Sequence, residues 1–223
     1  MIPVQLQPEP ASFDVKVRQA GNQAYQNDRQ KAVANGTDPD KDKLPSTWRK
    51  CLDDLYAAYG GICVFLAIRL RPATGAYTVE HFVPKSADPT KAYEWSNFRL
   101  ATARINSAKR EFRDVLDPFA IQPGWFALDI TSMSVIPGDK LDNPTGEAVK
   151  RTIERLKLNA PKCRTERDSI YNAFLMHKNL DVLMSDSPFI YQEHQRQGMN
   201  VAFSTLTSTV PAKPMLGRKA RHV

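Results

Sequence analysis

The chain has 223 residues, of which 42% are hydrophobic and 25% charged, and its formal net charge is +7. This composition is ordinary for a soluble globular protein, and no apolar run approaches the roughly 20 residues that a membrane helix needs. The first residues lack the charged and apolar regions of a signal peptide, so we expect a cytoplasmic protein with no membrane partner. The basic balance suits a polyanionic partner such as DNA or RNA.

The N-terminal third predicts two helices separated by a loop. Residues 1–15 look extended, residues 15–34 are polar and helical, and residues 35–43 form a loop by their Gly, Pro and Asp content. Ser46 is a suitable N-cap for a helix that runs to about Tyr59, where Gly60 and Gly61 end it. The apolar positions of this helix repeat at three and four, which predicts one buried face: Trp48, Leu52, Leu55 and Tyr59.

Strands and helices are expected to mix in the rest of the chain. The apolar run 62–70 (ICVFLAIRL) predicts a buried strand that pairs with a second strand at 77–83 as a hairpin. A loop at 84–96 then leads to a helix at about 103–113. Further along we expect a strand pair at 125–136, helices at 147–158 and 165–183, and a mobile segment from about Ser204 onward, where periodicity is lost.

The stretch from Thr78 to Lys109 carries the chemistry. It places Glu80 and His81 on the second strand, Asn97 after a loop and Asn106 on the following helix. Cleavage of a phosphodiester needs a base that takes a proton from water, and positive charge that neutralises the reacting phosphate. An imidazole supplies the base near neutral pH, and carboxylate and amide oxygens are suitable ligands for Mg²⁺.

These residues resemble a known family. The run EHFVPKS, then W-x-N-F-x-L, then I-N-x-x-K, is similar to the motif of the HNH, or ββα-metal, nucleases, over about residues 62–112. The resemblance implies that His81 is the general base and that Asn97 braces the loop and orients the histidine. It also implies that Glu80 and Asn106 bind the catalytic Mg²⁺ or Mn²⁺.

The chain departs from the family at the zinc-binding positions. Many HNH proteins carry two CxxC pairs that hold a structural zinc, and the matching positions here are Cys63, Leu66, Thr102 and Ile105. A closed zinc site needs four ligands, so we expect no structural zinc and expect Leu66 and Ile105 to fill the space by packing. Cys51, Cys63 and Cys163 form no CxxC pair, which favours free thiols, and Cys63 is expected to be an inert core residue.

The resemblance also implies the architecture. We expect an α+β fold in which a ββα unit is embedded in helices. Residues 1–45 would be an N-terminal extension, 46–136 the nuclease core, 137–203 a C-terminal helical part and 204–223 a flexible basic tail.

The expected activity is endonucleolytic cleavage of DNA that leaves 5′ phosphates, with RNA left open as a substrate. Basic residues that flank the motif are expected to hold backbone phosphates, although a merely solvated surface is the alternative: Lys85, Arg104, Lys109, Arg110 and Arg113. Some proteins similar to this chain act in phage defence, which implies an ATPase or another targeting protein as a partner. The rival reading is a non-catalytic nucleic-acid-binding or assembly subunit with the same ββα shape.

Overall fold

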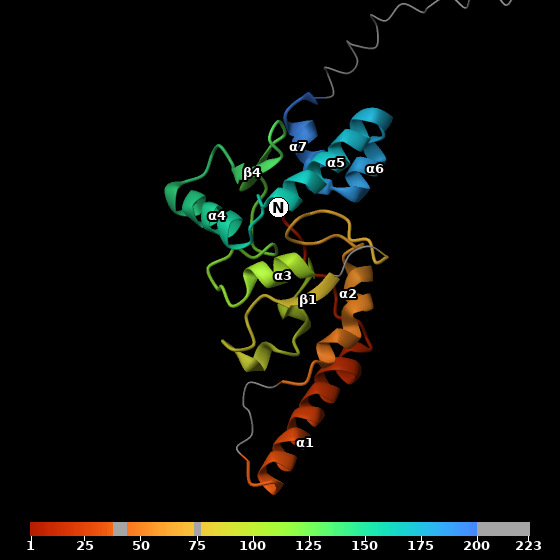
Figure 1. The fold of residues 1–223 in the computed structure, drawn as a ribbon, viewed down its shortest axis with the longest axis vertical. Coiled ribbons are helices and arrows are strands. Elements are labelled where there is room, and N and C mark those ends of the chain that lie inside the picture. Colours follow the sequence, from red (N-terminus) through yellow and green to blue (C-terminus); the bar gives the residue numbers. More distant parts are fainter. Residues whose placement is uncertain (38–43, 74–76, 200–223) are drawn as a thin grey trace, which may run out of the picture.

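The computed structural model describes residues 1–37, 44–73 and 77–199. It shows a mixed α and β fold with two small antiparallel sheets among its described residues. Helix α1 (Ala20–Ala34) projects from one end of the molecule, and α5 (Pro161–His177) lies at the other end (Figure 1). The basic tail and part of the loop expected at 35–43 lie outside the described residues.

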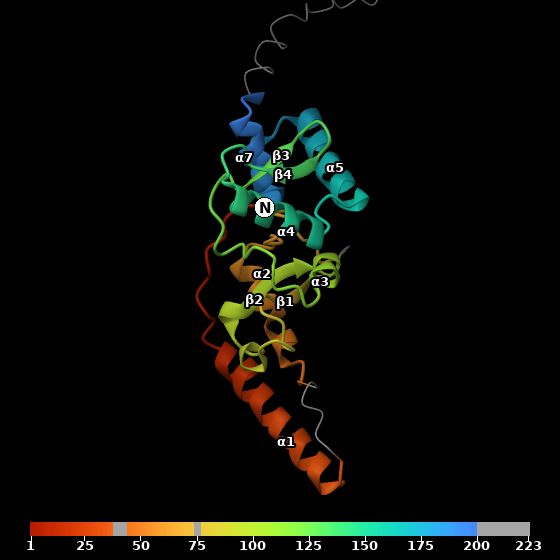
Figure 2. The same ribbon diagram turned by 90° about the vertical axis from the view of Figure 1, so that its left-hand side faces the viewer.

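A β–β–α unit occupies the middle of the molecule (Figure 2). Strand β1 (Tyr77–His81) pairs antiparallel with β2 (Phe98–Thr102), and α3 (Ala103–Lys109) follows β2 directly. The hydroxyl of Thr102 caps α3 by accepting a hydrogen bond of 3.1 Å from the N–H of Ile105. The helix ends at Lys109, because the next residue, Arg110, has a left-handed φ of 48°, and it is shorter than the helix predicted to Arg113.

The prediction of a continuous strand at 62–70 is wrong. This segment folds back on itself, so that Ile62 and Arg69 form an isolated bridge and the N–H of Cys63 donates to the C=O of Ile68 at 2.9 Å. Ala67 has a left-handed φ of 51°, which a continuous strand does not contain. The partner of β1 is β2 instead. Periodicity cannot separate a buried strand from another buried apolar segment, and that is why the prediction failed.

The two helices predicted before this segment are confirmed. A π-helical turn, η1 (Asp14–Gln19), continues into α1, and a 3₁₀ turn, η2 (Thr47–Cys51), continues into α2 (Leu52–Ala58). Ser46 holds the N-cap position of η2, but its side chain makes no capping hydrogen bond. Gly60 and Gly61 end α2 with left-handed φ values of 57° and 69°, as expected for C-terminal glycines.

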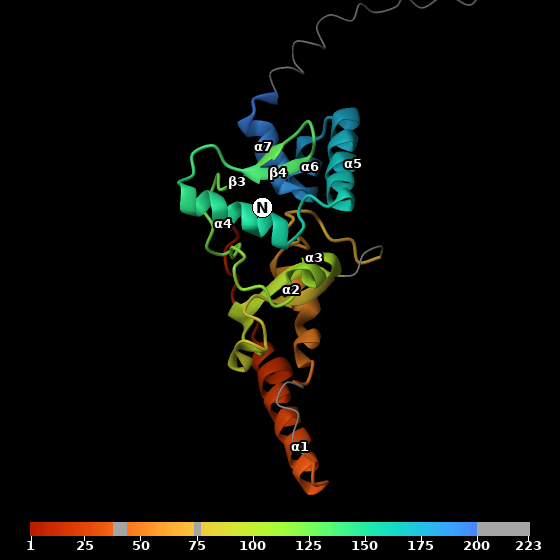
Figure 3. The ribbon, with the colours of Figure 1, turned by 60° about the vertical axis from the view of Figure 1, so that its left-hand side comes forward.

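The second sheet agrees with the sequence pattern, and the C-terminal helices agree with it in part. Strands β3 (Phe126–Asp129) and β4 (Ser134–Pro137) form the expected pair, and α4 (Asn143–Arg155) packs beside β4. Figure 3 shows α4 between the second sheet and α3. The helix predicted at 165–183 is divided. α5 ends at His177, the next residue Lys178 has a left-handed φ of 51°, and α6 (Leu180–Asp186) and α7 (Pro188–Arg196) follow.

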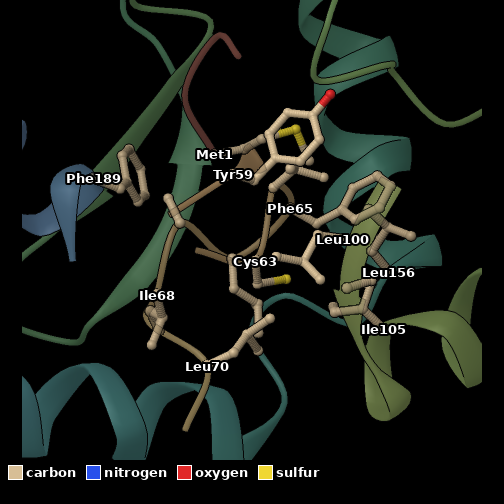
Figure 4. Packing of buried hydrophobic residues seen from close by; sticks show 14 of the residues in the cluster. Met1, Tyr59, Cys63, Phe65, Ile68, Leu70, Leu100, Ile105, Leu156 and Phe189 are labelled. Carbon is tan, nitrogen blue, oxygen red and sulfur yellow. The ribbon is translucent and has the colours of Figure 1, made fainter. Parts of the chain in front are cut away.

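One continuous cluster of buried hydrophobic residues extends from Met1 to Ile190. In Figure 4, Leu100 and Ile105 of the β–β–α unit lie near Leu156, which follows α4, and near Cys63. The regions expected as extension, nuclease core and C-terminal part therefore share one core, which holds α3 and α4 in fixed relation. No helix in the described ranges is long and apolar enough to cross a membrane.

Candidate active site

A cavity of about 430 Å³ opens where β1, α3 and η2 meet. Glu80 and His81 reach it from β1, and Asn106 reaches it from α3, so the structure brings together three residues that the sequence singles out. The remaining lining comes mainly from η2, from the loop after β1 and from the residues after α3: Trp48, Arg49, Thr78, Val79, Pro84, Lys85, Ser86, Arg110 and Glu111.

His81 is a buried, neutral imidazole. Its ring lies edge-on to the rings of Trp48 and Phe98, with centroid distances of 4.9 and 5.1 Å. Burial lowers the pKa of His81 to about 4, and the charge of Lys85 acts in the same direction. Nε2 lies 3.0 Å from the C=O of Ala92, and because a carbonyl only accepts, Nε2 must carry the hydrogen. The lone pair of His81 is therefore on Nδ1.

Asn97 fixes the loop that orients His81. Its Oδ1 accepts from the N–H of Val83 at 2.8 Å, and its Nδ2 donates to the C=O groups of Val83 and Lys91, each at 3.0 Å. Lys91 directly precedes Ala92, whose carbonyl receives the Nε2–H of His81. Asn97 does not line the cavity, so this geometry makes it a positioning residue.

Glu80 forms an ion pair in the interior of the protein. Its Oε1 lies 2.9 Å from Nζ of Lys109, and the two side chains are only 4% and 0% exposed. Lys109 also donates to the C=O of His81 at 3.0 Å. Burial raises the pKa of Glu80 to about 7, although the Lys109 ammonium favours the carboxylate and acts in the opposite direction.

Asn106 places its amide against β1. Its Nδ2 donates to Oγ1 of Thr78 at 3.2 Å and to the C=O of Val79 at 3.4 Å. With Nδ2 used in this way, Oδ1 remains as an acceptor. The carboxylate of Glu80 and the amide oxygen of Asn106 line the same cavity and are both hard oxygen donors, a set that fits Mg²⁺ or Mn²⁺.

The structure divides the predicted phosphate-binding residues. Lys85 and Arg110 line the cavity, and the Lys85 ammonium lies 3.8 Å from the ring centroid of Trp48. Arg104 and Arg113 are exposed but do not line it. The expectation for Lys109 is corrected, because its ammonium is fully buried on Glu80 and is not available to a bound phosphate.

Sequence reasoning missed Trp48 and Arg49 as parts of the site. They lie on η2, about 30 positions before β1, and the sequence pattern predicts only that Trp48 belongs to the buried face of its helix. Lys109 did carry a usable signal. It lies one helical turn after Ile105, on the same face of α3, and both residues are buried.

The positions that match the family's zinc ligands lie in the core. Cys63, Leu66 and Ile105 are all buried members of the central cluster, so the two apolar side chains pack as expected. Burial raises the pKa of the Cys63 thiol, although the nearby backbone N–H groups of Leu66 and Thr102 lower it. A high thiol pKa agrees with an inert core cysteine.

In the part of the chain that the structure describes, no three His, Cys, Asp or Glu side chains converge on one point. The cavity instead combines the carboxylates of Glu80 and Glu111 with one imidazole and one amide. Neither a scan of protein-family models nor a search of curated proteins gives a match for this chain. The function of this chain must therefore be inferred from its residues and their geometry.

Proposed function

We propose that this protein is a metal-dependent endonuclease of the HNH kind that hydrolyses DNA. One observation carries the proposal: Glu80, His81 and Asn106 line one cavity, where β1, α3 and η2 meet. A base, a carboxylate and an amide oxygen within one concavity are the groups that metal-assisted phosphodiester hydrolysis requires.

Each side chain has a task that follows from its surroundings. His81 is held by Ala92 through Nε2, so its Nδ1 is the atom that accepts a proton from the attacking water. Its pKa of about 4 keeps it unprotonated at neutral pH. Glu80 and Asn106 would hold the metal ion, which supplies positive charge to the reacting phosphate. Lys85 and Arg110 line the cavity, where they can contact phosphate oxygens.

One observation favours a second candidate function. Lys109 already neutralises Glu80 at 2.9 Å, which reduces the negative charge available to a cation. A chain that keeps the β–β–α shape and uses the cavity only to bind nucleic acid would have the same pair. This second candidate is a non-catalytic nucleic-acid-binding subunit, which binds nucleic acid but does not cleave it.

Conversion of supercoiled plasmid separates the two candidates. If the protein is a nuclease, we expect nicked or linear product with Mg²⁺ or Mn²⁺ and none with EDTA. His81→Ala should lower the rate by about 10²–10⁴, the usual contribution of a general base. His177→Ala, at an exposed histidine of α5, is the matched control and should cleave at the wild-type rate. Melting temperatures must show that both variants are folded.

The outcomes are distinct. Plasmid binding without cleavage in either metal would support the binding subunit and reject the nuclease. Cleavage by folded His81→Ala at the wild-type rate would reject the assignment of the base. Product ends add a chemical check, because the proposed cut leaves 5′ phosphates that a ligase rejoins without prior kinase treatment. A matched RNA substrate, tested in parallel, measures the preference for DNA.

A further inference from the structure

A second hollow adjoins the candidate active site. It has a volume of about 450 Å³ and lies between the C-terminal end of α3 and one face of α4. Its walls carry four cationic side chains and one carboxylate, together with small and aromatic residues: Arg110, Arg151, Arg155, Lys157, Glu154, Ser107, Ala108 and Phe112. We call this hollow the α3–α4 groove.

The α3–α4 groove adjoins the active-site cavity. Arg110 lines both of them, so this side chain lies where the two hollows meet. The cations of α4 lie outside the nuclease motif, which ends near residue 112. They reach the groove because the fold brings α4 close to α3. They were not among the phosphate-binding residues expected from the sequence.

The walls of the groove are firmly held. The hydroxyl of Thr152 on α4 accepts a hydrogen bond of 2.9 Å from the N–H of Leu116, in the segment that follows α3. The guanidinium carbon of Arg155 lies 4.1 Å from the ring centroid of Phe112, which orients this side chain along the wall. The groove therefore exists before any ligand binds.

Positive charge exceeds negative charge in this groove. Arg151 and Arg155 share one carboxylate, that of Asp114, at 3.8 and 3.3 Å. Among the described residues, Arg110 and Lys157 form no ion pair, whereas their neighbours Arg151 and Arg155 do. Arg110, Arg151 and Lys157 are exposed to solvent. Guanidinium and ammonium groups in such an array suit the regularly spaced phosphates of a nucleic acid.

We propose that the α3–α4 groove binds the phosphodiester backbone of the nucleic acid on one side of the scissile phosphate. The inference rests on the proposed function, because the cavity fixes where cleavage occurs. Arg110 contacts the phosphate nearest the cut, and Arg151, Arg155 and Lys157 contact those further along the backbone. These contacts are independent of base sequence, since they reach only phosphates.

Binding measurements test the groove without relying on catalysis. The variant Arg151→Gln/Lys157→Gln removes two groove cations. The variant Arg29→Gln/Lys31→Gln removes two exposed cations from α1, which projects from one end of the molecule away from α4 (Figure 1). Both variants lose the same net charge. Fluorescence anisotropy with a labelled duplex in EDTA, from low to high salt, gives the affinity and its salt dependence for the full chain.

The groove variant should bind more weakly by about tenfold or more at low salt, and its slope of log affinity against log salt should be smaller by about 1.8, for two lost phosphate contacts on duplex DNA. The α1 variant should keep the wild-type slope. Equal losses of affinity in the two variants, or no loss of affinity in either, would overturn the proposal that the groove binds the backbone. Displacement of the duplex by polyglutamate at equal charge would point to an acidic protein and would also overturn it.

Failure of the groove and failure of the proposed function can be told apart. Suppose that the wild type cleaves DNA with Mg²⁺ or Mn²⁺ while the groove variant binds DNA as tightly as the wild type. The proposed nuclease activity is then supported, and backbone binding by the groove is rejected. If the groove variant loses affinity while wild type never cleaves, the groove stands and the nuclease is rejected. A wild-type chain that binds no nucleic acid at low salt rejects the groove.

Discussion

The ammonium of Lys109 lies 2.9 Å from the carboxylate of Glu80, and the two side chains are almost completely removed from solvent. Transfer of each charge from water into the interior costs several kcal/mol, which the ion pair and the hydrogen bond from Lys109 to the C=O of His81 offset. The pair fixes the carboxylate against α3. It also joins the two residues on which the proposed chemistry depends, because one lysine contacts both Glu80 and the backbone of His81.

Replacing Lys109 by Met should destabilise the protein strongly. The variant leaves the Glu80 carboxylate buried without a partner, and loss of one member of a buried pair typically costs about 3–5 kcal/mol. The variant Glu80→Gln/Lys109→Met leaves no buried charge and should recover part of this loss. Free energies of unfolding from urea titrations measure both effects. Lys162→Met, at an exposed site on α5, is the control, and an equal loss there would contradict the prediction.

His81 should give the free energy of unfolding a specific pH dependence. Its folded-state pKa of about 4 lies below the value of about 6.5 for an imidazole in an unfolded chain. Between these values the unfolded state binds the proton and the folded state does not, so acid destabilises the fold. The contribution of His81 is complete above about pH 6.5 and is lost as the pH falls towards 4.

The measurement compares wild type with His81→Gln by urea unfolding in EDTA over this pH range. Stability of the wild type relative to the variant should fall by up to about 1.4 kcal/mol per pH unit as the solution is acidified. Subtraction removes the contribution of Glu80, whose pKa burial shifts in the opposite sense. A difference that stays constant with pH would show that His81 is not buried in its neutral form.

Asn97→Ala should reduce both stability and the rate of cleavage. The variant removes three hydrogen bonds from the loop that carries Ala92, the backbone partner of His81. Unpaired groups of this kind cost about 1–3 kcal/mol each when they stay buried. Asn97→Asp should not rescue the loss, because a carboxylate cannot donate to the carbonyls of Val83 and Lys91. Because Asn97 does not line the cavity, kcat should fall while KM changes little, and a wild-type kcat in a folded Ala variant would count against this role.

Asn106 should be essential for activity and dispensable for the fold. Its Nδ2 makes two hydrogen bonds at 3.2 and 3.4 Å, so Asn106→Ala should cost about 1 kcal/mol of stability and nearly all cleavage. Asn106→Asp keeps a hard oxygen ligand and should retain part of the activity with Mg²⁺. Asn106→His should shift the metal preference towards Ni²⁺, since imidazole suits transition ions. Full activity of the Ala variant with a lowered melting temperature would remove Asn106 from the metal site.

The sequence predicts the order of strand, loop and helix around the site because that unit is local in the chain. Residues 77–109 contain both strands of the β1–β2 pair, Asn97, whose side chain fixes the loop, and the helix that carries Asn106. Alternation and capping are properties of neighbouring residues, so they are visible without the fold. Strand β2 was not predicted. Nearly all of its residues are buried, so its sequence lacks the alternation of polar and apolar residues that indicates a half-exposed strand.

The parts that the sequence did not predict depend on distant neighbours. The sequence predicts that Lys109 contacts phosphate or is solvated, whereas its ammonium is buried because it pairs with the carboxylate of Glu80 on another element. The cations of α4 line the α3–α4 groove because that helix lies near the end of α3, a relation that no local pattern specifies. The run 62–70 was expected to form a strand because its residues are apolar and branched, and its reversal at Ala67 is a tertiary feature.

This reversed segment protects the small sheet that carries the candidate site. The N–H of Val64 donates to the C=O of Leu100 at 3.0 Å, on the side of β2 that β1 does not cover. An uncovered strand edge is a template on which a strand from another molecule can add. If the segment 62–70 detaches, the outer edge of β2 becomes open while its apolar side chains are exposed. Self-association of partly unfolded molecules is therefore expected to begin at β2, and the segment acts as a cap against it.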